Sequence, residues 1–298
     1  MIFEQTINDG LPNEAAFFER ENRLLTDYAS VTGFQFNRGT KWQIDLETGK
    51  ATYNPSFFIK QGYSLTQSLF ASVHEVEHWR ELLELLNQDG GRDEWERNKA
   101  RWKATPRLHL LDNYIADVKD NKRVLTTFPS LNDETCRLYR DFLFPETQIS
   151  NKLFHIQFLE AILRESMLPE ENVSVSPQVR EGIEKLKKIT GTSGKTWNII
   201  EIVTDKSINP LSRLRLTEEY IEPIYEALYQ QDLQNRKPKD SQDTDKPQNQ
   251  GSADPFEQEH NEMREKLPRP LPEAEIEEAI MKVKRNESEA DRALKAYE

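Results

Sequence analysis

Apolar residues recur every three or four positions between Ser64 and Gly90, which is the spacing of an amphipathic helix. Ser64 and Gln67 are typical of a capping box, in which each side chain bonds the other residue's backbone N–H. Gly90 and Gly91 mark the expected C-terminal end. The pattern therefore predicts one long helix with defined ends, whose apolar face carries Leu65, Leu69, Phe70, Val73, Leu82, Leu83 and Leu86.

The same periodicity predicts a second helix over residues 107–121, with acids and amides on the face opposite its leucines. A further helix is expected over 14–30, capped by Asn13. Residues 41–46 alternate apolar and polar side chains, and 51–54 follow after a turn, so these segments predict a hairpin. Other helices are expected over 134–142, 152–165, 178–189 and 211–233. The expected fold class is α+β, a mostly helical domain with a small hairpin at its front.

The hydrophobic side chains are distributed unevenly along the chain. Residues 1–232 carry most of the aromatic and aliphatic side chains and predict one folded domain. A disordered linker is expected over 233–272, because 234–252 contain no apolar residue to bury. Residues 273–298 predict a C-terminal helix, which is too short to be stable alone. This helix is expected to dock, to bind a protein partner or to begin a further region, through a stripe of Ile276, Ala279, Ile280 and Val283.

The amino-acid composition limits the classes of protein to which this chain can belong. The 52 acids outnumber the 40 bases, giving a formal charge of −12, which argues against a nucleic-acid partner. No apolar run approaches the roughly 18 residues that span a bilayer, so no membrane association is expected. The first residues lack the basic and apolar regions of a signal peptide. The single cysteine, Cys136, excludes a disulfide within the chain, so we expect a cytoplasmic protein.

The expected long helix contains the pentapeptide His74-Glu75-Val76-Glu77-His78. An α-helix turns by about 100° per residue, so His74 and His78 lie one turn apart on the same face. Both imidazoles can therefore reach one metal ion, and Glu75 lies beside the first of them. Two His ligands with an adjacent Glu as general base form the H-E-x-x-H arrangement of zinc peptidases. Glu77 is expected to point away from both His and to face solvent.

A catalytic zinc ion usually takes three protein ligands and keeps one position open. Asp117, on the polar face of the helix expected over 107–121, is the predicted third ligand. The alternatives on the same helix are Asp120, Asp112 and His109. Asp117 could instead hold an imidazole N–H without touching the metal.

These residues resemble the zincin superfamily of H-E-x-x-H metallopeptidases over roughly residues 34–125, with the gluzincin-like layout in which a later helix supplies the third ligand. Asn113 and Asp117 match part of the familiar Asn-Glu and Asp pattern, but no Glu follows Asn113. Glu77 also departs from the uncharged residue usual at its position, whereas Trp79 fits. The resemblance implies an edge strand, here within 41–46, with which a peptide substrate pairs.

The expected function is a zinc-dependent peptidase that cleaves peptide or protein substrates with a metal-activated water and Glu75 as general base. His155 is a candidate oxyanion donor, although a buried core histidine is the favoured interpretation. No specific role is expected for His260. One alternative is a catalytically inactive zincin-fold scaffold, acting through its acidic linker and C-terminal helix. Another is a structural zinc site with a fourth protein ligand.

Overall fold

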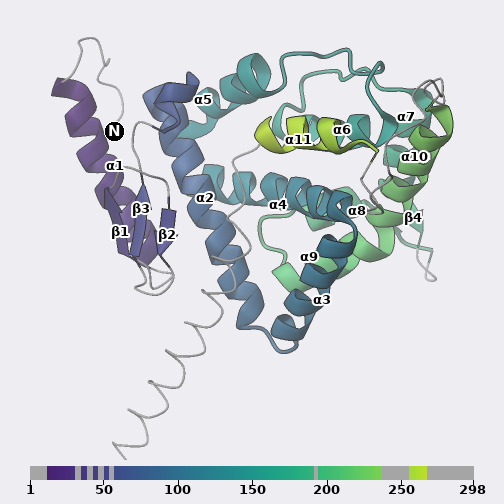
Figure 1. Ribbon diagram of the computed structural model, residues 1–298, viewed down its shortest axis with the longest axis horizontal. Helices are drawn as coiled ribbons and strands as arrows, with labels where there is room; N and C mark the ends of the chain where they lie inside the picture. Colours follow the sequence, from purple (N-terminus) through teal and green to yellow (C-terminus); the bar gives the residue numbers. More distant parts are fainter. Residues whose placement is uncertain are drawn as a thin grey trace, which may run out of the picture. The chain divides into compact units, whose positions relative to one another are not determined.

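The computed structural model describes residues 12–30, 35–38, 43–45, 50–53, 57–190, 194–236 and 255–266 (Figure 1). These residues form two compact units. The first takes its described residues from 12–92 and 123–138, and the second from 93–122 and 139–266. The division falls within one continuous helix, α4 (Pro106–Thr127).

The first unit is organised around α2 (Leu65–Leu86), against which α1 (Pro12–Ser30), α5 (Asn132–Arg137) and the 3-10 turn η2 (Pro129–Leu131) pack. A second 3-10 turn, η1 (Ile59–Gln61), precedes α2. The predicted second helix is longer than expected, since α4 runs from Pro106 to Thr127. α1 begins at Pro12, so the expected cap at Asn13 is wrong, because that residue is already helical.

The local signals around α2 are confirmed in detail. Gln67 N–H donates to Ser64 Oγ at 3.2 Å, and Ser64 N–H donates to Gln67 Oε1 at 2.9 Å, which completes the capping box. Gly90 adopts a φ of +73°, a left-handed conformation that glycine tolerates and that lets the chain turn. Between residues 68 and 77 every side chain is buried, so this part of α2 is enclosed on all sides rather than on one face.

The expected hairpin is present, as β2 (Gln43–Asp45) pairs antiparallel with β3 (Lys50–Tyr53). A third strand, β1 (Gln35–Arg38), pairs parallel with β3 and gives the order β1-β3-β2. The sequence did not predict β1, because Phe36 is the only apolar residue in its four positions. Both β1 and β2 therefore lie at edges of this small sheet.

In the second unit, α6 (Phe154–Met167) packs against α7 (Pro177–Leu186) and α10 (Glu222–Asn235). Phe158, Leu159 and Tyr225 are fully buried in its core. The helix expected over 211–233 is divided, because Pro223 at the start of α10 cannot donate a backbone N–H. The remaining elements are α3 (Gly91–Ala104), the π-helical turns η3 (Leu138–Leu143) and η4 (Thr217–Ile221), β4 (Ile189–Thr190), β5 (Thr196–Trp197), α8 (Ile199–Val203), α9 (Pro210–Leu216) and α11 (Glu257–Lys266).

Several of these elements, including the helices α3 and α11, were not predicted. α3 carries mostly charged side chains, but its own Trp95 is buried and supplies an apolar anchor. α11 lies inside the segment 233–272, so the linker assignment does not hold for residues 257–266. The C-terminal helix expected over 273–298 lies outside the described residues. Along the described part of the chain, no helix combines the length and the apolar character needed to cross a membrane.

Candidate metal centre

The two histidines of the pentapeptide converge, as their spacing predicts. His74 Nε2 lies 2.9 Å from His78 Nε2, and the ring centroids are 4.4 Å apart. His74 is fully buried and His78 is half-buried. Two imidazole nitrogens at this distance either share one proton or face one common cation.

The predicted third ligand, Asp117, is fully buried on α4, in the part of that helix that belongs to the second unit. Asn113 Nδ2 donates to Asp117 Oδ2 at 3.4 Å and helps to orient that carboxylate. Two nitrogens on one tetrahedral zinc ion lie about 3.3 Å apart, given Zn–N bonds of about 2.05 Å. The two imidazoles therefore fit a divalent cation with a shift of a few tenths of an ångström, and nitrogen donors also suit other such ions.

Glu81 is a further carboxylate on α2 beside the second histidine. It is 5% exposed, and the sequence analysis missed it, although it lies three residues after His78 and therefore shares that face of the helix. Asp120, the alternative on α4, is fully buried in the second unit.

The other two alternatives are engaged elsewhere in their own unit. Trp102 Nε1 donates to Asp112 Oδ2 at 2.6 Å, and the Trp102 ring lies 5.0 Å from the His109 ring. Neither residue belongs to a cation-binding group among the described residues. Burial raises the pKa of Asp112 to about 6, although nearby Arg213 opposes the shift.

Asp112 predicts a specific dependence of stability on pH. The unfolded carboxyl ionises near pH 3.8, whereas the folded one keeps its proton to about pH 6. The folded state therefore binds more protons in this window, and the free energy of unfolding falls by up to about 3 kcal/mol as pH rises through it. Asp112→Asn should remove this decline in urea-unfolding measurements. The exposed Asp141→Asn is the control, and an unchanged decline in Asp112→Asn would contradict the assignment.

Glu75 is 3% exposed, beside the two histidines on α2. Tyr63 precedes the helix, and the negative charge of Glu75 affects its pKa. Burial raises the pKa of Tyr63 to about 12, and the negative charge of Glu75 adds to the shift. A neutral phenol therefore lies near the candidate base, and no signal in the sequence marked Tyr63.

Glu77 does not face solvent as expected. Its side chain is fully buried, and its Oε2 accepts from Arg80 Nη1 at 3.1 Å and from the Tyr28 hydroxyl. Its Oε1 forms an ion pair with Arg123 Nε at 2.8 Å. Burial raises the pKa of Tyr28 above its usual value, and the charge of Glu77 reinforces this. The charged residue at the second middle position of the motif is therefore part of an ion-pair network that ties α2 to α1 and to the end of α4.

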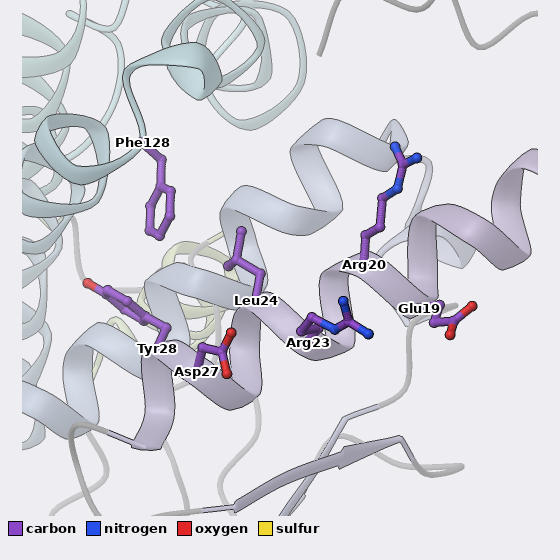
Figure 2. A pocket seen from close by; sticks show the side chains of 7 residues that line it. All are labelled: Glu19, Arg20, Arg23, Leu24, Asp27, Tyr28 and Phe128. Atoms are coloured by element: carbon purple, nitrogen blue, oxygen red, sulfur yellow. The ribbon is translucent and has the colours of Figure 1, made fainter. Parts of the chain in front are cut away.

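A cavity of about 800 Å³ lies elsewhere in the first unit (Figure 2). Leu24 and Tyr28 of α1 line it together with Phe128, and charged side chains of α1 surround them. None of the pentapeptide residues contributes to its lining. The cavity is therefore separate from the candidate metal ligands.

Two buried histidines of the second unit contact each other. His155 is fully buried, as the favoured interpretation predicted, and both of its ring nitrogens have hydrogen-bond partners. This leaves no ring N–H for an oxyanion. His260, for which no role was expected, is also fully buried and contacts His155.

Comparison of the chain with protein-family models, with curated proteins and with solved structures found no match.

Proposed function

We propose that this protein binds a divalent cation, zinc in the first instance, and acts as a zincin-like peptidase. The observation that carries the proposal is the convergence of His74 Nε2 and His78 Nε2 on α2, and the buried Asp117 is the third ligand that we propose. Three donors leave one coordination position open, which is typical of catalytic rather than structural zinc. The single cysteine also supports a reducing compartment, and we place the protein in the cytoplasm.

The cation, when bound, would acidify water and polarise the substrate carbonyl. His74 and His78 hold it, and the rigid helix fixes both imidazoles one turn apart. Glu75 takes a proton from water and passes it to the leaving amine. Its nearly complete burial keeps bulk water from competing for that proton. Tyr63, kept neutral by its raised pKa, is suited to donate a hydrogen bond to the developing oxyanion.

The sheet offers a place for an extended substrate. β2 lies at an edge of the sheet and precedes α2 in the chain, in the order that the zincin resemblance implies. A peptide can add to such an edge as a further strand, through main-chain hydrogen bonds. The substrate class we propose is therefore an extended peptide or an unfolded protein segment.

A second function is favoured by one specific observation. Glu75 is 3% exposed, and it does not line the cavity between α1 and Phe128. A metal-stabilised scaffold without catalysis needs no substrate access to Glu75. In that case the acidic linker and the C-terminal segment would bind a protein partner.

The first test is the metal content of the purified protein after zinc loading, measured by mass spectrometry. We expect about one zinc ion per chain, and we expect His78→Ala to lose it, because three ligands are needed for a stable site. Asp117→Ala and Asp120→Ala distinguish the two candidate third ligands, since only the variant that lacks the true ligand loses zinc. His109→Ala is the matched control, because the His109 ring packs against the Trp102 ring at a centroid distance of 5.0 Å. Zinc-free wild type, or zinc retained in His78→Ala, would overturn the proposed function.

A further inference from the structure

Three buried polar side chains of the second unit form a chain of hydrogen bonds that the proposed function does not use. Asp232 lies on α10, His155 in the first turn of α6 and His260 on α11. His155 Nδ1 lies 2.6 Å from Asp232 Oδ2, and His155 Nε2 lies 2.8 Å from His260 Nε2. Both histidines are fully buried, and Asp232 is 5% exposed.

The hydrogen-bond partners fix the position of each proton. Asp232 Oδ1 accepts the Phe154 N–H at 2.8 Å and Oδ2 accepts the His155 N–H at 3.0 Å, so this carboxylate caps α6 as an acceptor only. His155 Nδ1 must therefore carry a proton and donate to Asp232. In the neutral imidazole this leaves His155 Nε2 as an acceptor, so His260 Nε2–H is the donor between the two rings.

The docking of α11 depends on the contact between His155 and His260. The helix has 10 residues, which is too short to be stable without docking. Its anchors are Phe256, whose ring lies 5.5 Å from Tyr229, Met263, whose sulfur accepts from the Tyr114 hydroxyl at 3.5 Å, and His260. His260 is therefore the polar anchor between two apolar ones.

The charged and titratable groups around the pair come from four helices. Asp232, Tyr225 and Tyr229 face it from α10, and the Arg107 guanidinium of α4 lies 4.2 Å from the Tyr229 ring. The Arg236 guanidinium lies 5.4 Å from the Phe256 ring. On α6, Glu160 is paired with Lys152, and on α11 itself Glu257 and Glu259 are exposed. The carboxylate that contacts the pair directly is Asp232.

We propose that α11 is a proton-operated latch, held closed by the single proton that His155 and His260 share. A second proton turns both Nε2 atoms into donors that face each other, and the hydrogen bond between the rings is lost. Asp232 stabilises the resulting His155 cation, while His260 reaches solvent with α11. The open state therefore binds more protons than the closed one, and docking of α11 weakens as pH falls.

The test is hydrogen–deuterium exchange of the full chain at about pH 7.5 and about pH 5.5, corrected for the intrinsic exchange rate. In wild type we expect exchange of the α11 amides to be at least about tenfold faster at the lower pH, with α6 still protected. His260→Gln should remove this dependence, because its amide can donate to neutral His155 or accept from the cation. His109→Gln is the control and should behave as wild type.

Equal protection of α11 at both pH values in wild type would overturn the latch. So would loss of α6 protection together with α11, since that is general acid unfolding. A pH dependence that persists in His260→Gln would show that another group carries the proton. None of these readouts requires bound metal, so they remain separate from the test of the peptidase.

Discussion

Replacing Glu75 with Gln is expected to lower peptide hydrolysis by roughly 10²- to 10⁴-fold, the usual contribution of a general base. The amide keeps the size and hydrogen-bonding reach of the carboxylate but cannot take a proton at neutral pH. Zinc content should stay at the wild-type value, since Glu75 is not among the candidate metal ligands. Cleavage of a mixed peptide library, followed by mass spectrometry, measures the first quantity, and metal analysis measures the second.

Glu84→Gln provides the matched control for this loss. It is the same isosteric change on the same helix, at a side chain that is 42% exposed and pairs with Arg123. Hydrolysis should be retained in Glu84→Gln. Wild-type hydrolysis in Glu75→Gln would exclude Glu75 as the base, whereas zinc binding without any hydrolysis by wild type would favour the scaffold.

Glu77→Ala is expected to lower the free energy of unfolding by about 3–5 kcal/mol, the usual cost of removing one partner from a buried ion pair. The Glu77 side chain is fully buried, and its loss leaves the Arg123 and Arg80 guanidiniums and the Tyr28 hydroxyl without this acceptor. Urea unfolding measures the change.

Glu84→Ala tests whether the effect comes from burial. Glu84 contacts the same Arg123 at 2.7 Å, but its side chain is 42% exposed, so its loss should cost no more than about 1 kcal/mol. Equal losses in the two variants would contradict the argument. A stable Glu77→Ala protein would show that the network can be satisfied by water.

The candidate site shows which structural features can be predicted from short-range sequence patterns. The ends of α2 follow from Ser64, Gln67 and Gly90, because capping and left-handed turns depend on neighbouring residues only. The convergence of His74 and His78 follows from helical geometry, since residues four apart share a face. Asp117 was named as a ligand from the polar face of its helix, because no local pattern can record a pairing between residues about 40 positions apart.

Other features depend on contacts that no local pattern records. β1 has a single apolar residue, and its pairing with β3 comes from a partner 15 positions later, Lys50 opposite Gln35. α3 and α11 look like polar segments, and their order comes from buried anchors supplied by Trp95, Phe256 and Met263. The low apolar content of these two segments therefore gave no signal for either helix.

The sequence by itself determined where α2 begins and ends, that it carries two histidines on one face, and that the chain is mostly helical, because these properties arise within a few residues. The tertiary structure alone decided that Glu77 is buried among arginines and that His260 contacts His155. These pairings join residues far apart in the chain, and burial by distant segments, which local periodicity cannot encode, is what gives them their chemistry.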